Sequence, residues 1–183
     1  MQQTQRNPIE EASDDKSTWG EGPWQNEPDR LEWRDKTTGL PCLILRGPSG
    51  ALCGYVGVAP GHPLHKVKYD AAYMGKKRRR RDKRLMASIS VHGGITYSNG
   101  CEGHICHVPR PGETHNVWWL GFDCAHCFDV MPRIAAQLRM AGEIMKAMDP
   151  RPCPVNFPED KYRDVAYVKA ECADLAGQLK AMQ

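Results

Sequence analysis

The sequence predicts an α+β fold in which a mostly antiparallel sheet of four or five strands packs against two amphipathic helices near the C-terminus. Three observations support this fold: short β-rich apolar runs fill the middle of the chain, turn-forming residues separate them, and two long segments with helical periodicity follow. A chain of 183 residues with 40% hydrophobic residues can build one sizeable core. We therefore expect a flexible polar tail at 1–22 and a single α+β domain at 23–183.

The clearest strands are predicted at 40–45 and 51–58. The two apolar runs are joined by Gly47-Pro48-Ser49-Gly50, whose residues readily adopt turn dihedrals, so they are expected to form a hairpin. Ahead of them, 27–34 is predicted as a helical turn, with a proline early in the segment and Trp33 facing the body.

Further strands are predicted at 85–91, continuing past a glycine pair into 95–98, and at 116–122. In the last of these runs Trp118 and Trp119 are neighbours, so their rings must point to opposite faces of the sheet. One ring is expected in the core. For the other, packing is favoured over a surface on which a base could stack.

Two helices are predicted at 130–148 and 162–182, because apolar residues recur there at spacings of three and four. The first stops before Asp149-Pro150, and the second carries charged residues opposite its apolar face. Both helices are expected to cover one face of the sheet.

Charge and apolar content indicate the compartment. No secretory signal is recognisable at the N-terminus, and no apolar run approaches the roughly 20 residues that span a bilayer, so the expected location is the cytoplasm. The eight cysteines are accordingly interpreted as thiols or metal ligands rather than disulfides. The net charge is +3, but 76–84 alone carries +7 and the remainder −4.

The segment 75–84 is predicted as a basic loop between strands. Such a density of cations can neutralise phosphates, so polyanion contact is as well supported as a merely solvated loop. No aromatic or helical pattern that reads bases accompanies it. The candidate ligand-binding cations are Lys76, Lys77, Arg78, Arg79, Arg80 and Arg81.

The run from His92 to Tyr97 is the first candidate site. His92 follows an alternating apolar run, so its imidazole is expected at a strand end, a common place for a reacting group. Gly93 and Gly94 allow positive φ and a close approach of ligand to backbone N–H groups. Thr96 and Tyr97 complete the candidate ligand-binding residues. An equally supported alternative is a β-bulge whose histidine caps a neighbouring carbonyl.

A second candidate site lies where the aromatic strand meets the first helix. There Asp123, His126 and Asp129 are expected around one strand-to-helix turn. A carboxylate beside a histidine can fix its tautomer for acid–base work or metal ligation, so Asp123 is expected to orient an imidazole. Asp129 is favoured instead as the N-cap of the helix.

Two cysteine pairs suggest zinc as a candidate cofactor. Cys101 and Cys106 are followed, after a short interval, by Cys124 and Cys127, and tetrahedral zinc is commonly held by two such pairs. Against this, the first pair is spaced more widely than usual, and Cys127 could simply pack. The histidines that could replace one thiolate are His104, His107 and His126.

Several of these motifs together resemble a family of small proteins encoded by bacteriophages and prophages. The resemblance covers roughly 40–179 and rests on Gly61-His62-Pro63, on Val91-His92-Gly93-Gly94-Ile95-Thr96-Tyr97, on 118–126 with Asp129, and on 162–169. The basic segment and Cys127 depart from the family pattern, which weakens the zinc hypothesis. The resemblance implies a phage accessory role, against host defence or in nucleotide metabolism, but no specific activity.

The leading hypothesis is an accessory protein that binds or hydrolyses a phosphate-containing small molecule such as a nucleotide. His92 and His126 would act as acid and base or as phosphate ligands, with Asp123 orienting one of them and His62 joining them. One alternative is a non-enzymatic inhibitor of a host protein, or a nucleic-acid-binding protein, acting through 76–84. Another is a zinc-stabilised binding domain without catalysis.

Overall fold

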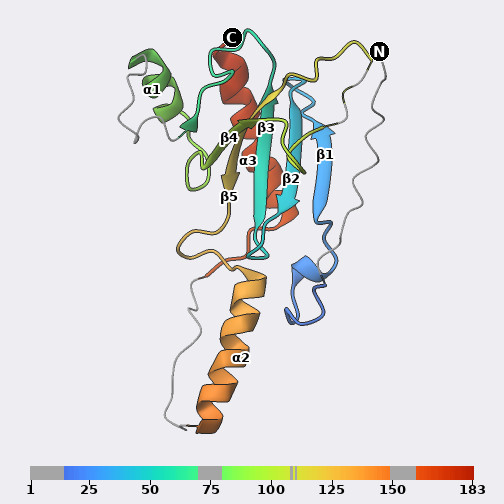
Figure 1. Cartoon of the computed structure of the whole chain (residues 1–183), viewed down its shortest axis with the longest axis vertical. Coiled ribbons are helices and arrows are strands. Elements are labelled where there is room, and N and C mark those ends of the chain that lie inside the picture. The colour runs from blue at the N-terminus through green and yellow to red at the C-terminus, as the bar shows by residue number, and fades with distance from the viewer. Residues whose placement is uncertain (1–14, 70–79, 108, 110, 149–159) are drawn as a thin grey trace.

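A computed structural model describes residues 15–69, 80–107, 109, 111–148 and 160–183. Within these residues, one antiparallel sheet has the strand order β1-β2-β3-β5-β4 (Figure 1). The predicted α+β class is confirmed. The strands are β1 (Arg30–Arg34), β2 (Pro41–Arg46), β3 (Leu52–Val58), β4 (Tyr97–Gly100) and β5 (Trp118–Asp123).

The predicted hairpin is confirmed as β2 and β3. Gly50 takes a φ of 85° in the connecting turn, a conformation that glycine adopts without a side-chain penalty. The prediction of a helical turn at 27–34 is wrong, because β1 pairs with β2 there and sets Trp33 opposite Cys42. Leu31 and Trp33 alternate onto the core face, and this burial outweighs the local helical signal.

Helix α3 (Val165–Ala181) packs on β3 and β2 and confirms the second predicted helix. Its N-cap is Asp164, whose side chain accepts a hydrogen bond from the backbone N–H of Tyr167 at 2.8 Å. A Cβ on Gly54 of β3 would lie 2.7 Å from the Cys172 sulfur, so the absence of a side chain there allows helix and strand to meet closely.

The opposite face of the sheet has its own small core of Leu43, Tyr55, Val117 and Trp119. Trp118 belongs instead to the core under α3, so the two tryptophans do point to opposite faces. Both are buried, and packing rather than a stacking surface is confirmed.

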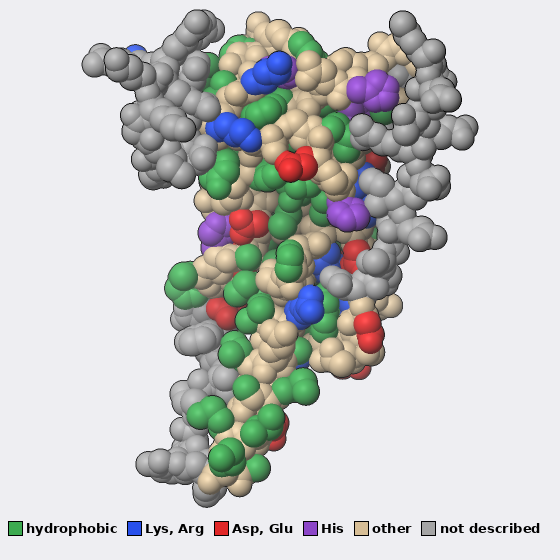
Figure 2. Space-filling model, in the orientation of Figure 1, with side chains coloured by type: hydrophobic (Ala, Val, Ile, Leu, Met, Phe, Trp, Pro, Cys, Tyr) green, Lys and Arg blue, Asp and Glu red, His purple; other side chains and the backbone are tan. Residues whose placement is uncertain are grey.

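Helix α2 (Pro132–Met148) confirms the first predicted helix, but the prediction that it covers the sheet is wrong. It extends beyond the end of the sheet (Figure 1), and Figure 2 shows hydrophobic side chains along its surface. Among the described residues, its first turns pack through a cluster of Ala136 with Trp19 and Trp24. The exposed apolar residues on α2 are Leu138, Met140, Ile144, Met145 and Met148.

The folded part begins earlier than the predicted boundary at residue 23. Trp19 is only 3% exposed, and the guanidinium of Arg139 on α2 donates to its carbonyl at 2.7 Å. A short 3-10 helix, η1 (Pro23–Gln25), follows and buries Trp24. The part of the predicted tail at 1–14 lies outside the described residues.

The strand predicted at 85–91 is wrong, because helix α1 (Arg80–Ala87) ends there and an irregular segment follows. The backbone N–H of Ser90 donates to Oε1 of Gln178 at 2.8 Å. The Nε2 group of Gln178 in turn donates to the Ser90 carbonyl at 2.7 Å. A side chain of α3 thus supplies the pairing that a neighbouring strand would have supplied. The predicted basic loop is helical from Arg80, and its first part, 75–79, lies outside the described residues.

In the part of the chain described here, no helix combines the length and apolar character needed to cross a bilayer.

Candidate functional site

Three side chains from two distant segments meet beside the N-terminal part of α3. His92 lies in an irregular turn, and His126 and Asp129 lie in the connection between β5 and α2. One nitrogen from each histidine and one Asp129 oxygen all lie within 4.8 Å of one another. The structure therefore brings together two histidines predicted as site residues, and it adds a carboxylate that was favoured as a helix cap.

Asp129 is the buried member of this His92–His126–Asp129 centre. Its Oδ2 lies 2.7 Å from His92 Nε2 and accepts the backbone N–H of His126, while its Oδ1 accepts Nε–H of Arg163 at 2.8 Å. Burial alone would raise the pKa of Asp129, but hydrogen bonds from Arg163, His92 and the His126 backbone outweigh it and hold the pKa below its usual range. Asp129 is therefore a buried carboxylate anion.

The N-cap role predicted for Asp129 is wrong, because α2 begins only at Pro132. A backbone bridge to Lys161 fixes the position of Asp129 instead: the Val130 N–H donates to the Lys161 carbonyl at 3.0 Å, and the Lys161 N–H donates to Phe128 at 2.8 Å. The bridge also brings Arg163 beside the carboxylate. This pairing joins segments far apart in the sequence.

His92 is held at three points. Its backbone N–H donates to Glu171 at 2.8 Å, its Nδ1 lies 3.0 Å from the Tyr167 hydroxyl, and its Nε2 faces Asp129. Because an ionised carboxylate only accepts, Nε2 carries the proton in the neutral ring and Nδ1 accepts from Tyr167. Burial and the nearby Glu171 carboxylate raise the pKa of Tyr167, which keeps its hydroxyl protonated.

His126 differs from His92 because one of its nitrogens lacks a partner. Its Nδ1 is buried and makes no hydrogen bond within the described residues, and it lies 3.8 Å from Asp129 Oδ2 and 3.8 Å from Asp123 Oδ1. Both separations are too long for hydrogen bonds. The ring packs against Gly93, where an added Cβ would come within 2.0 Å of His126 Cε1.

Asp123 has a different role from the one predicted. Its Oδ1 accepts the backbone N–H of Ala125 at 3.1 Å and so stabilises the turn after β5. The carboxylate that directly orients an imidazole is Asp129, and that imidazole is His92.

His62 lies away from the centre. Its Nε2 donates to the Leu179 carbonyl at 2.9 Å and its Nδ1 accepts from the Leu64 N–H at 3.0 Å, so the buried ring caps the C-terminal end of α3. Burial lowers the pKa of His62 and favours this neutral form. Leu179 is about 18 Å along the helix axis from Tyr167, at about 1.5 Å per residue.

Of the other residues predicted to bind a ligand, some adjoin the centre and others belong to the sheet. Gly93 adjoins His126 as described above, and Gly94 has a φ of 84° with open space beside it. The Thr96 N–H donates to the Gly121 carbonyl at 2.9 Å, which ties its backbone to the sheet. Tyr97 packs edge-on against Tyr55 in the small core on the far face, so its side chain is not part of the centre.

The four cysteines predicted as zinc ligands do not come together. Cys101 and Cys106 form a disulfide beside the core of the far face, contrary to the prediction of free thiols. Cys124 is buried in the core under α3, where burial raises its pKa, and Cys127 is exposed. The sheet lies between Cys124 and the Cys101–Cys106 disulfide. The side chain that accompanies Cys101 and Cys106 is His107, whose buried Nδ1 has no hydrogen-bond partner in the described residues.

The candidate cations of the basic segment fall into two groups. Lys76, Lys77, Arg78 and Arg79 lie outside the described residues, whereas Arg80 and Arg81 form the start of helix α1. Contact between the segment 76–84 and nucleic acid or an acidic protein stays a prediction.

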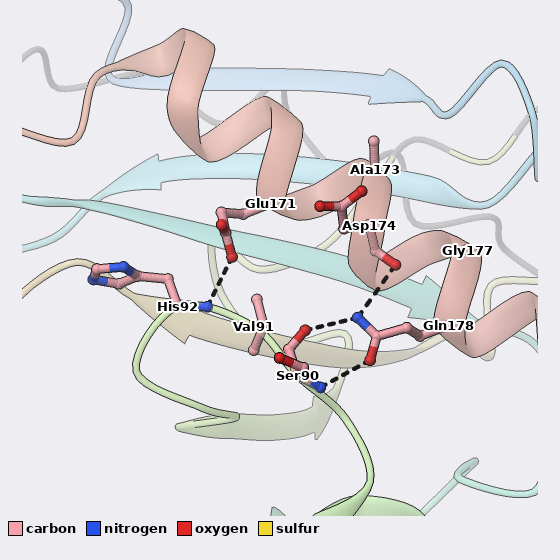
Figure 3. Close-up of a pocket in the computed structure, with 8 residues that line it drawn as sticks. All are labelled: Ser90, Val91, His92, Glu171, Ala173, Asp174, Gly177 and Gln178. Carbon is pink, nitrogen blue, oxygen red and sulfur yellow. Dashed lines mark hydrogen bonds between the residues drawn. The ribbon is translucent and has the colours of Figure 1, made fainter.

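Two hollows adjoin the centre. An open groove of about 570 Å³ runs along α3 between Ser90 and Gln178, and Glu171 and Asp174 contribute carboxylates to it. Figure 3 shows the His92 imidazole pointing away from this groove. The second, of about 290 Å³, reaches Asp129 itself and is lined by Trp19, Trp24 and the first turns of α2.

Three residues that contact the centre were not among the predicted site residues: Arg163, Tyr167 and Glu171. Tyr167 and Glu171 are one turn apart on α3 and therefore share a helix face. Arg163 directly precedes the N-cap of the same helix. Arg163 and Tyr167 lie in the motif at 162–169, which carried the family resemblance but assigned them no role, and Glu171 showed only its polar character beside the apolar stripe. Their partners come from distant loops, so no local spacing could have paired them.

Comparisons with protein-family models, with curated proteins and with solved structures found no match. The chemistry of the centre is therefore argued from its own geometry. Two imidazoles, a buried carboxylate and a guanidinium at one place can exchange protons, bind an anion or hold a metal ion.

Proposed function

We propose that this protein hydrolyses a phosphate-containing small molecule, with nucleotides as the substrate class, at the His92–His126–Asp129 centre. The observation that carries the proposal is the arrangement of Asp129, whose two oxygens accept from His92 and Arg163. Beside it lies a His126 nitrogen that has no hydrogen-bond partner among the described residues. Such a set offers a basic group for water and a cation for the phosphate in one place.

The reaction needs an activated water and stabilisation of charge on the phosphoryl oxygens. The centre takes a proton from water, the resulting hydroxide oxygen forms a bond to phosphorus, and the ester P–O bond breaks as the leaving oxygen takes up a proton. In Arg163, the Nε–H is bonded to Asp129, so the Nη groups can donate to phosphoryl oxygens. The cavity between Asp129 and the tryptophans Trp19 and Trp24 can take an apolar part of the substrate.

The resemblance to phage-encoded proteins supports a role as a phage accessory protein acting on nucleotides or host-defence signals in the host cytoplasm. This biological setting is part of the proposal and rests on the motifs at 91–97 and 118–126. The inhibitor and nucleic-acid alternatives depend on 76–84, whose first part, 76–79, lies outside the described residues.

The test measures hydrolysis of 4-nitrophenyl phosphate, bis(4-nitrophenyl) phosphate and a nucleotide panel by the full chain. His126→Ala and Asp129→Asn are expected to lower kcat/KM by about 100-fold or more, the usual range for loss of a proton-transfer group. His115→Ala is the matched control, because His115 is exposed and outside the centre. Equal activity in all three variants, or no turnover of any substrate, would contradict the proposal.

A further inference from the structure

We infer that the His92–His126–Asp129 centre is a binding site for a divalent transition-metal ion, with His92 Nε2, His126 Nδ1 and Asp129 Oδ2 as its three protein ligands. The inference rests on the proposed function for its chemistry, but metal binding is measured separately from turnover. Two imidazole nitrogens and one carboxylate oxygen form a donor set suited to Zn²⁺ and to other first-row divalent ions.

The spacing of the donor atoms fits such an ion. Two ligand atoms bound at about 2.0–2.1 Å to a tetrahedral ion lie about 3.3 Å apart. Here Asp129 Oδ2 lies 2.7 Å from His92 Nε2 and 3.8 Å from His126 Nδ1, so the observed distances bracket that value. One ligand atom from each of the three residues lies within 4.8 Å of the other two, so small side-chain shifts can bring all three to one ion.

Among the described residues, Nδ1 of His126 has no hydrogen-bond partner, and this is a second observation that suits a metal ligand. A buried imidazole nitrogen without a hydrogen bond costs free energy, because water no longer solvates it. A metal ion between this nitrogen and Asp129 would satisfy it. Gly93 packs against the ring, and a side chain there would force the imidazole out of its position.

The groups surrounding the three ligands also suit a metal centre. Metal-bound histidines usually hydrogen-bond through their second nitrogen, and His92 Nδ1 already has the Tyr167 hydroxyl at 3.0 Å. The second oxygen of Asp129 is held by Arg163 at 2.8 Å, which fixes the carboxylate orientation. On metal binding, the ion replaces the proton on His92 Nε2, and Nδ1–H then donates to Tyr167.

A three-ligand site leaves a coordination position open, as catalytic zinc sites do. A divalent ion with two neutral imidazoles and one carboxylate keeps a net positive charge, to which Arg163 adds another. This combination attracts a phosphoryl oxygen, and the ion lowers the pKa of a bound water so that it can attack phosphorus. The inferred cofactor class is therefore a divalent ion that acts as a Lewis acid.

The test uses Co²⁺ as a spectroscopic probe on the reduced full chain after chelator treatment, followed by competition with Zn²⁺. The expected result is one Co²⁺ per chain with visible d–d bands and no thiolate-to-cobalt charge-transfer band. His126→Ala and Asp129→Asn should abolish that spectrum. Tyr167→Phe, which removes only a hydroxyl partner of a ligand, should weaken affinity by about 10–100-fold.

Controls separate this site from the other cluster of potential ligands at Cys101, Cys106 and His107. A Cys101→Ser/Cys106→Ser variant should keep the spectrum unchanged. A charge-transfer band that disappears in this variant, or no stoichiometric binding in the wild type, overturns the inference. Circular dichroism and urea unfolding confirm that each variant is folded, and Tyr167→Phe remains a test if a ligand variant fails to fold.

Turnover of 4-nitrophenyl phosphate, measured in parallel, keeps the two proposals distinguishable. Stoichiometric metal at the centre without turnover of any phosphate ester contradicts the proposed function and leaves the metal site standing. Turnover by chelator-treated protein that also fails to take up stoichiometric Co²⁺ contradicts the metal site and leaves the proposed function standing.

Discussion

The buried carboxylate of Asp129 organises its neighbours through contacts that differ in kind. It accepts a hydrogen bond from His92, forms an ion pair with Arg163 and accepts the backbone N–H of His126. Each contact favours the ionised form, and together they outweigh the cost of burying the charge. A residue with this many specific partners fixes the geometry of a site, because its movement would break several bonds at once.

Gly93 provides a residue-level test of the centre. Its φ is 62°, and a Cβ would lie 2.0 Å from His126 Cε1, so Gly93→Ala must strain the backbone and displace the imidazole. We expect destabilisation of about 1–3 kcal/mol, the usual range for such strain, together with loss of hydrolysis. Urea unfolding and the phosphate ester assay measure the two effects.

Gly94→Ala is the matched control for Gly93→Ala. Gly94 also has a positive φ, 84°, but no atom lies within 4 Å of the position its Cβ would occupy. The control carries backbone strain alone, so it should lose stability while retaining much more activity than Gly93→Ala. Equal activity losses in the two variants would show that contact with His126 is not what Gly93 provides.

Among the elements, α3 does the most to build the centre, because it supplies side chains along one side while its apolar face packs on the sheet. Tyr167 and Glu171 both hold His92, and Gln178 pairs with Ser90 further along. The segment 88–92 therefore follows the helix rather than joining the sheet. The position of His92 depends on how closely α3 packs against β3.

Substitutions at two glycines test how closely α3 packs on the sheet. At Gly54 a Cβ would lie 2.5 Å from Phe122 Cζ and 2.7 Å from the Cys172 sulfur, so Gly54→Ala should destabilise by about 1–3 kcal/mol through overpacking. Gly177 within α3 has no atom within 4 Å of its Cβ position, and Gly177→Ala should stabilise by up to about 1 kcal/mol. Equilibrium unfolding in urea measures both. Similar effects of the two substitutions would contradict this packing.

At the element scale, local signals predicted some segments well and failed for others. The β2–β3 hairpin and α3 were predictable, because turn residues and apolar residues at spacings of three and four can be recognised within a short stretch of the sequence. The strand expected at 85–91 was wrong, although its residues alternate, because the Gln178 side chain satisfies the backbone of Ser90. Alternation alone does not show which partner a backbone will find.

At the scale of the whole molecule, α2 extends beyond the end of the sheet with most of its large apolar side chains exposed. Its first turns pack on Trp19 and Trp24, but Ile144 and Met145 are 62% and 59% exposed. An amphipathic helix normally buries its apolar stripe against the core of its own domain. Periodicity predicted the helix correctly and its packing wrongly.

The projection of α2 can be tested by comparing two truncations. Ile144→Ala should change the free energy of unfolding by no more than about 0.5 kcal/mol, because the side chain is exposed. Leu175→Ala on α3, where the side chain is fully buried, should cost about 2–5 kcal/mol. Chemical denaturation of both variants is the measurement. A cost of several kcal/mol for Ile144→Ala would mean that α2 packs on another part of the molecule.

The sequence by itself determined the α+β class, the β2–β3 hairpin and the two long helices, and it predicted that His92 and His126 belong to one site. These follow from periodicity, turn residues and side-chain chemistry, which act over a few neighbouring positions. Only the tertiary structure decided that Asp129 rather than Asp123 orients an imidazole, that His62 caps α3, and that the two cysteine pairs lie apart. Arg163 and Tyr167 also joined the centre only through folding. Such partnerships form between segments distant in the chain, where contact depends on how sheet and helix pack and not on spacing along the sequence.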